Sequence, residues 1–136
     1  MDKKTIKKTI KINAPINKVW RAFTDPIITR QMGGEYVTDW TAGSSFGWKG
    51  ADGNMYTNGT ILQVENERLI KHNLFDIGQK EKILSVITYK FESQHTQTTL
   101  HSLEELNYEM TDQQYKDAAE GWDFALASIK EIAEKS

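Results

Sequence analysis

Residues 111–132 read TDQQYKDAAEGWDFALASIKEI, and this stretch decides the fold. It opens with a capping box, in which Thr111 is the N-cap and Gln114 follows three residues later. One helical stripe then carries Tyr115, Ala118, Trp122, Ala125, Leu126, Ile129 and Ile132. An amphipathic helix of about twenty residues is roughly 30 Å long, enough to cross a whole sheet. The pattern therefore predicts a long C-terminal helix that buries one face against a sheet.

The chain before this helix alternates in the way that is typical of strands. Residues 35 to about 105 show no helical period, and turn signals recur at intervals of roughly ten residues. The turn signals lie at residues 42–44, 51–54, 65–67, 77–79 and 93–95. The strongest strand is ILSVITYKF at 83–91, which is rich in β-branched and aromatic residues. We expect an antiparallel meander of about six strands.

The N-terminal segment adds one strand and two short helices. Apolar residues alternate with Thr and Lys over residues 5–12, which predicts a half-buried strand, although Lys8 interrupts the apolar face. An amphipathic helix follows, with Pro15 suited to its first position. Asp25 can then cap a second short helix, which stops at the glycine pair 33–34.

Composition limits the classes of function. The 136 residues lie within the usual range for one domain, and we expect residues 1–136 to form a single domain. The absence of cysteine excludes thiol catalysis, thiolate zinc sites and disulfides. The net charge of −2 predicts binding to neither nucleic acid nor an anionic membrane. No apolar run approaches the ~20 residues of a membrane span, so we expect a cytoplasmic protein.

The order of elements predicts a cavity between the sheet and the long helix. Antiparallel sheets twist and curl, and one helix cannot fill all the space beneath a strongly curled sheet. Ala118 and Ala125 are small residues on the helical stripe and leave room there. Gly121 costs ~1 kcal/mol relative to alanine inside a helix, which predicts a close backbone approach on that side.

Aromatic residues are the candidates for lining such a cavity. The segment DWTAGSSFGWKG at 39–50 is expected to form a hairpin at the end of the sheet, with two of its rings pointing inward. Rings build ordinary cores as well as ligand pockets, so both interpretations stay open for the set. The residues expected to line the cavity are Trp40, Phe46, Trp48, Tyr56, Phe75, Tyr89, Trp122 and Leu126.

No motif for catalysis, a metal or a cofactor stands out, and we expect none of the three. His72, His95 and His101 lack the spacing of convergent ligands, and each is expected at the surface or hydrogen-bonded. An acidic residue could serve as a general acid or base if it faced a dry cavity, but solvated carboxylates are the expectation. These acidic residues are Asp39, Glu65, Glu67, Asp76, Glu104, Glu105 and Glu109.

Five segments together resemble the bacterial relatives of the activator of the heat-shock-protein-90 ATPase. They are NAPINKVWRAFTDP (13–26), DWTAGSSFGWKG (39–50), NGTILQVENERLI (58–70), ITYKFES with QTTLHS (87–102) and GWDFALASIKEI (121–132). This group belongs to the START or birch-pollen-allergen-like superfamily, also called SRPBCC. The resemblance spans nearly the whole chain. It implies an α+β helix-grip fold, in which a curved antiparallel sheet of about six or seven strands grips the C-terminal helix over a hydrophobic cavity.

The resemblance also implies what the cavity does. Binding of an unidentified hydrophobic or amphipathic small molecule ranks first, and an enzyme of the cyclase or hydratase type ranks second. A co-chaperone that stimulates a chaperone ATPase ranks third, because the separate chaperone-binding domain of eukaryotic members has no counterpart here. Met32 stands where such proteins commonly carry an aromatic residue near the cavity mouth, so we add Met32 to the expected lining. The oligomeric state stays open.

Overall fold

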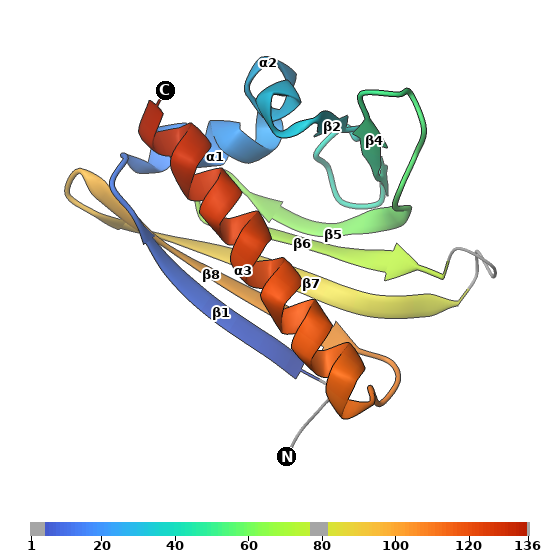
Figure 1. Cartoon of the computed structure of the whole chain (residues 1–136). Coiled ribbons are helices and arrows are strands. Elements are labelled where there is room, and N and C mark those ends of the chain that lie inside the picture. Colours follow the sequence, from blue (N-terminus) through green and yellow to red (C-terminus); the bar gives the residue numbers. More distant parts are fainter. Residues whose placement is uncertain (1–4, 77–81, 136) are drawn as a thin grey trace.

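The computed structural model describes residues 5–76 and 82–135, which fold into an α+β arrangement (Figure 1). The helical elements are α1 (Ile16–Thr24), α2 (Pro26–Thr29), the 3-10 turn η1 (Arg30–Met32) and α3 (Asp112–Lys135). The strands are β1 (Thr5–Ile12), β2 (Gly34–Tyr36), β3 (Ser45–Phe46), β4 (Trp48–Gly50), β5 (Gly59–Glu65), β6 (Leu69–Phe75), β7 (Ile83–Gln94) and β8 (Gln97–Leu106). The predicted order of a strand, two short helices, a meander and a long helix is confirmed.

The main sheet contains six strands in the order β1-β8-β7-β6-β5-β3, with antiparallel neighbours. The N-terminal strand pairs with the last strand, from Thr5 opposite Glu105 to Ile12 opposite Thr98. Helix α3 crosses one face of this twisted sheet, while α1, α2 and the β2–β4 pair lie along one end of the same face (Figure 1). In the described ranges, no helix combines the length and the apolar character needed to cross a membrane.

The predicted capping box starts α3. The Gln114 backbone N–H donates to Thr111 Oγ1 at 3.1 Å, and the Thr111 backbone N–H donates to Gln114 Oε1 at 3.0 Å. Two backbone donors that the first helical turn leaves without intrahelical partners are thereby satisfied. The helix runs for 24 residues, slightly longer than the sequence pattern predicted.

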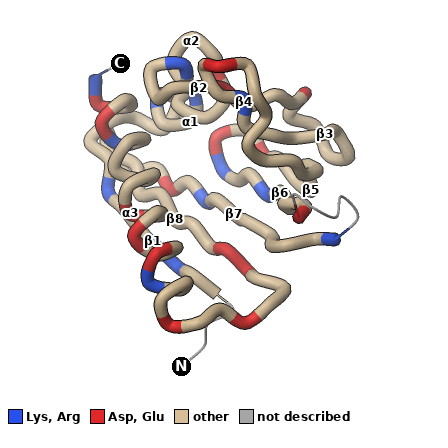
Figure 2. The backbone as a smooth tube through the Cα atoms, turned by 45° about the vertical axis from the view of Figure 1, so that its right-hand side comes forward, with Lys and Arg blue, Asp and Glu red and all other residues tan. Residues whose placement is uncertain are grey.

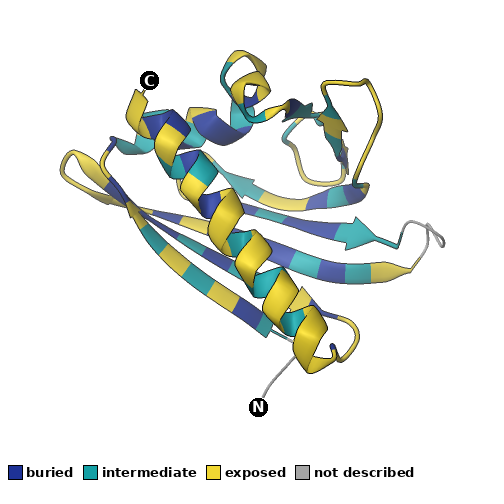
Figure 3. Cartoon of the chain, viewed as in Figure 1, coloured by how far each residue is buried: buried dark blue, intermediate teal, exposed yellow. Residues whose placement is uncertain are grey.

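The two halves of α3 are buried to different extents. Leu126, Ile129, Ile132 and Ala133 in its C-terminal half are buried in the main core, against residues of α1, β7 and β8. The N-terminal half contributes only partly buried side chains and is largely exposed (Figure 3). The helix is therefore anchored at its C-terminal end, and its other end lies over the sheet with less packing beneath it.

Lys8 interrupts the apolar face of β1 for a structural reason. Its Nζ lies 2.9 Å from Asp123 Oδ1, so the side chain bridges from the sheet to α3. The alternation of β1 is otherwise as predicted, with Ile6 and Ile12 buried.

The arrangement of residues 34–50 differs from the predicted hairpin. Strand β2 pairs with β4 in a small separate sheet, with Tyr36 opposite Trp48, while β3 between them joins the edge of the main sheet beside β5. A Cβ added at Gly34 would collide with the Lys49 carbonyl and the Trp48 indole, so glycine permits this close pairing. Residues 34–50 therefore form an arm over β5 and β6 instead of a simple hairpin.

Backbone geometry supports most of the predicted turns. The turns at 42–44, 51–54, 65–67 and 93–95 each contain a residue with positive φ, namely Gly43, Gly53, Glu67 and His95. The turn predicted at 77–79 lies outside the described residues.

Candidate functional site

Two adjoining cavities lie on the face of the sheet that carries α3. The first has a volume of about 150 Å³ and is lined by Tyr36, Phe46, Trp48, Thr57, His72, Leu74, Ile87 and Tyr89. The second has a volume of about 290 Å³ and is lined by Tyr89, Glu104, Ala118, Gly121, Trp122 and Ala125. Tyr89 lines both cavities, so we call the two together the cleft. Residues of β2, β3 and β4 line the first cavity, and residues of α3 line the second. The backbones of β2–β4 and of α3 lie apart from each other over the main sheet (Figure 2).

The alternation of side chains along β7 and β8 determines which residues form the floor of the cleft. Ser85, Ile87, Tyr89 and Phe91 alternate along β7, and all four are buried. On β8, Glu104 lies directly opposite Ile87 and therefore projects to the same face. The floor thus combines an apolar and aromatic row on β7 with one carboxylate on β8.

Aromatic rings that pack against one another form one wall of the cleft. Tyr36 contacts Phe46 with ring centroids 5.1 Å apart and Trp48 with centroids 4.8 Å apart. Phe46 in turn stacks on His72, with centroids 4.0 Å apart. Such ring pairs stabilise beyond their burial and hold the wall in a defined geometry.

His72 is a neutral acceptor within this wall. Only 3 % of its surface is exposed, and burial lowers its pKa to about 4, a shift that the hydrogen bond to Asn73 partly offsets. Nδ1 lies 3.0 Å from the Asn73 carbonyl oxygen, which can only accept, so Nδ1 carries the proton. Nε2 is consequently left with a free lone pair.

The two phenols at the centre of the cleft stay protonated at neutral pH. Burial raises the pKa of Tyr36 to about 12, although a hydrogen bond with the Tyr89 side chain lowers it in part. Burial likewise raises the pKa of Tyr89 well above its ordinary value, and the charge effects of Tyr36 and Glu104 add to this. Both hydroxyl groups therefore act as neutral donors and acceptors.

Glu104 is held in place by two neutral donors. The Trp122 indole N–H donates to Oε1 at 3.0 Å, and the Ser85 hydroxyl donates to Oε2 at 2.8 Å. The side chain is half-buried, so the expectation of a solvated carboxylate is wrong for this residue. The period-2 alternation that includes Leu100 and Leu106 passes through position 104 and could have indicated this inward orientation.

Helix α3 leaves the second cavity open because its facing residues are small. Ala118, Gly121 and Ala125 lie on one face of the helix, three and four residues apart. A Cβ added at Gly121 would meet no atom within 4 Å. The predicted close backbone approach at Gly121 is therefore wrong, since this position faces open space.

Four of the predicted lining residues come together in the cleft, namely Phe46, Trp48, Tyr89 and Trp122. Leu126 is buried in the main core, and Met32 and Trp40 pack against that core. Tyr56 is 54 % exposed and donates its hydroxyl hydrogen bond to Asp52. Phe75 is half-buried at the end of β6 and lines neither cavity.

Sequence reasoning did not select the polar and glycine positions of the cleft. Tyr36 was not among the predicted lining residues, whereas it lies at the centre of the ring wall. Thr57, His72, Glu104 and Gly121 also line the cleft. Within the described part of the chain, no group of three or more His, Cys, Asp or Glu side chains could hold a metal ion.

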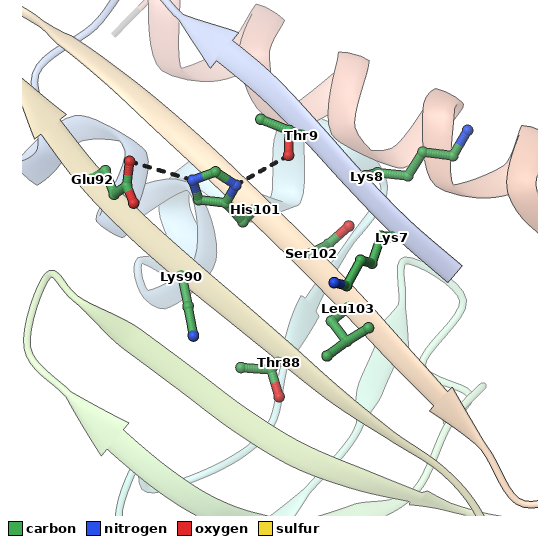
Figure 4. Close-up of a pocket in the computed structure, with 9 residues that line it drawn as sticks. All are labelled: Lys7, Lys8, Thr9, Thr88, Lys90, Glu92, His101, Ser102 and Leu103. Carbon is green, nitrogen blue, oxygen red and sulfur yellow. Dashed lines mark hydrogen bonds and ion pairs between the residues drawn. The ribbon is translucent and has the colours of Figure 1, made fainter. Parts of the chain in front are cut away.

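A larger depression of about 440 Å³ lies on the opposite face of the sheet (Figure 4). Its lining residues are Lys7, Lys8, Thr9, Thr88, Lys90, Glu92, His101, Ser102 and Leu103. His101 bridges Thr9, with Nδ1 3.0 Å from Oγ1, and Glu92, with Nε2 3.4 Å from Oε2. Thr9, Glu92 and His101 thus partner one another across the strands of a sheet surface, and Lys8 pairs with Asp123 instead. We therefore place the candidate site in the cleft, where the polar groups project into a partly apolar hollow.

Comparison with known proteins gives a consistent picture. A family model described as "Activator of Hsp90 ATPase homolog 1-like protein" matches residues 13–134. No curated protein matches the sequence.

Solved structures share the fold at low sequence identity. Protein ChR145 from Cytophaga hutchinsonii is 27% identical with a TM-score of 0.78, and the match covers 99% of this chain and 97% of that one. CalU16 from Micromonospora echinospora is 22% identical with a TM-score of 0.75, covering 95% and 75% of the two chains. The Aha1 dimer from Colwellia psychrerythraea is 18% identical with a TM-score of 0.76, covering 96% of each chain.

Proposed function

Because this chain belongs to the family of activator of Hsp90 ATPase homolog 1-like proteins, we propose that its cleft binds a hydrophobic or amphipathic small molecule. The observation that carries the proposal is the open space beneath the N-terminal half of α3, where an added Cβ at Gly121 meets no atom within 4 Å. Ligand sites combine mainly apolar walls with a few placed polar groups and measure roughly 300–1,000 Å³. The second cavity, at about 290 Å³, lies near the lower end of this range.

The hollow has a physical cost that a ligand would offset. Side chains that line a void lose the dispersion contacts that a packed neighbour would provide. A larger residue at any of the small positions Ala118, Gly121 and Ala125 would project toward this space. A bound molecule would supply the missing contacts and bury the exposed part of the Trp122 side chain.

Filling the cleft from the helix tests this proposal. In Gly121→Leu, the new side chain would occupy the space that the ligand needs, without displacing a core residue. We expect the neutral fluorescent probe N-phenyl-1-naphthylamine to bind the parent protein and to bind Gly121→Leu about tenfold more weakly or worse, a loss of about 1.4 kcal/mol. Fluorescence titration measures both affinities.

Ala127→Leu is the matched control, because Ala127 is an exposed position of the same helix and does not line the cleft. It adds the same side chain elsewhere and should bind the probe like the parent. Equal probe affinity for Gly121→Leu and the parent would show that the probe does not use the cleft, and would remove the proposal.

An enzyme of the cyclase or hydratase type is the second candidate. The observation that favours it is the pairing of an ionisable carboxylate, Glu104, with the neutral phenol of Tyr89 in the same cavity. A general acid or base must lie within hydrogen-bond reach of the reacting proton, and both groups are placed to contact a bound molecule. Stimulation of a chaperone ATPase stays a third alternative, supported by the family description alone.

A further inference from the structure

Building on the proposed function, we infer that the cleft selects amphipathic molecules that carry a positively charged nitrogen. The cation would lie against Glu104, beside the rings of Tyr89 and Trp122, and the apolar part would extend toward Phe46 and Trp48.

The hydrogen bonds of Glu104 position its carboxylate without neutralising it. Each oxygen accepts one hydrogen bond, from the Trp122 indole or the Ser85 hydroxyl, and both donors are uncharged. A carboxylate offers about four acceptor sites, so each oxygen retains the capacity for another donor. The group therefore presents a fixed negative charge to the second cavity.

No protein cation neutralises this charge in residues 5–76 and 82–135, where neither lysine nor arginine forms an ion pair with Glu104. Lys8 projects toward α3 from the neighbouring strand, but it pairs with Asp123 at 2.9 Å. A charge beside an apolar cavity is unfavourable unless it is paired. A cationic ligand would provide the partner that the protein does not.

The rings next to Glu104 suit the same kind of ligand. The Tyr89 and Trp122 rings are 5.8 Å apart between centroids and inclined by 60°. Ring faces attract a cation that lies within about 6 Å of the centroid, and tryptophan does so most strongly. The indole that bonds Glu104 thus also borders the space in which the cation would lie.

The same arrangement disfavours anionic ligands. A fatty-acid carboxylate in the second cavity would lie near Glu104, and like charges in a poorly solvated space repel each other. We therefore expect the order of affinity to be cation, then neutral molecule, then anion.

Three probes with the same chain length separate charge from hydrophobicity: dodecyltrimethylammonium, dodecanol and dodecanoate. The two ionic probes are kept below their micelle-forming concentrations, and dodecanol is kept below its solubility limit. Competition with N-phenyl-1-naphthylamine measures their affinities. We expect the ammonium probe to bind the parent about tenfold more tightly than the alcohol, with the carboxylate weakest. In Glu104→Gln, which retains an acceptor for the indole, the ammonium affinity should fall to that of the alcohol, and the alcohol affinity should stay within about twofold.

Glu105→Gln is the matched control, because Glu105 is the next residue on β8, is exposed and projects to the other face of the sheet. It should keep the preference for the ammonium probe. An ammonium probe that binds the parent no better than the alcohol would overturn the inference, and so would a preference that survives in Glu104→Gln. Both results leave alcohol binding, and with it the proposed function, intact.

Failure of the proposed function has a different signature, in which neither the naphthylamine nor any of the three dodecyl probes binds the parent. Circular dichroism checks that Glu104→Gln is folded. If it is not, the affinity order of the three probes for the parent protein decides the inference without the variant.

Discussion

Lys8 and Glu104 are charged side chains on the face of the sheet beneath α3, and the structure accommodates them in different ways. Lys8 reaches Asp123 and lies partly in solvent, where such an ion pair contributes about 0.2–1 kcal/mol. Glu104 is held by two neutral donors at the edge of the cleft. The first residue therefore links two elements, whereas the second gives the cleft its charge.

The lowered pKa of His72 leads us to predict how the free energy of unfolding depends on pH. Its pKa is about 4 in the folded protein, below the ordinary value of 6.5, so the unfolded chain binds more protons between these two values. Stability should therefore fall as the pH drops from about 6.5 toward about 4, by up to about 3 kcal/mol from this residue. His72→Phe keeps a ring against Phe46 and should reduce this fall, as urea unfolding at a series of pH values would measure.

His95 provides the control for this prediction. It lies in a turn with a φ of 59°, and asparagine tolerates that conformation. His95→Asn should retain the full loss of stability at low pH. An unchanged pH dependence in His72→Phe would show that His72 does not titrate as its burial indicates.

At the scale of elements, the two halves of α3 are stabilised differently. The C-terminal half is well packed, whereas the N-terminal half depends mainly on the capping box at its first turn. The capping box at Thr111 and Gln114 satisfies the first turn, and Tyr115 adds a hydrogen bond from its hydroxyl to the Thr5 carbonyl at 3.3 Å. The C-terminal half is fastened by Leu126 and Ile129 in the core. A helix anchored in the core at its C-terminal half can extend over a cavity without filling it.

The substitution Gly121→Ala tests whether a close packing contact requires glycine at this position or whether the position faces open space. Alanine in a helix is favoured over glycine by ~1 kcal/mol, and the new methyl group meets open space. We therefore expect the variant to be stabilised by about 1 kcal/mol in urea unfolding. Ala127→Gly, the reverse change at an exposed position of the same helix, should destabilise by a similar amount. A destabilised Gly121→Ala would reveal a close contact at this position.

At the scale of the whole molecule, the core lies toward one end and the cleft beside it. Strand β1 forms one edge of the sheet and pairs with β8. The C-terminal half of α3 packs against α1 in the main core. The 34–50 arm and the N-terminal half of α3 approach the sheet from opposite sides of the cleft (Figure 2). Movement of residues 34–50 or of the N-terminal half of α3 would change the width of the cleft without disrupting the core.

Amide hydrogen exchange should reveal this division. We expect the strongest protection in the centres of β7 and β8 and in α3 from Leu126 onward, because these segments are buried. The N-terminal half of α3 should exchange faster. Saturation with dodecyltrimethylammonium should raise protection in that half and leave the core unchanged, and mass spectrometry of peptides would measure both. Equal protection along α3 in the free protein would contradict this description.

Much of the cleft could be anticipated, because single residues carry local signals. Phe46, Trp48, Tyr89 and Trp122 were predicted as lining residues from their aromatic character, and they do line it. His72 and Glu104 were assigned ordinary roles, since a histidine or a carboxylate carries no local mark of what surrounds it. Tyr56 met the same aromatic criterion and is exposed, which shows the limit of residue type alone.

Local patterns were sufficient for the helices, for the long strands, for the caps at Asp25 and Thr111 and for most of the turns, because periodicity and capping depend on residues a few positions apart. Pro15, which was expected at the first helical position, is instead the N-cap of α1. Tertiary structure alone decided that β3 joins β5, that Glu104 lies under Trp122 and that Gly121 faces open space. The last two features depend on how far α3 stands from the sheet. That separation is set by core contacts between residues far apart in the chain. A local sequence pattern contains no information about such contacts.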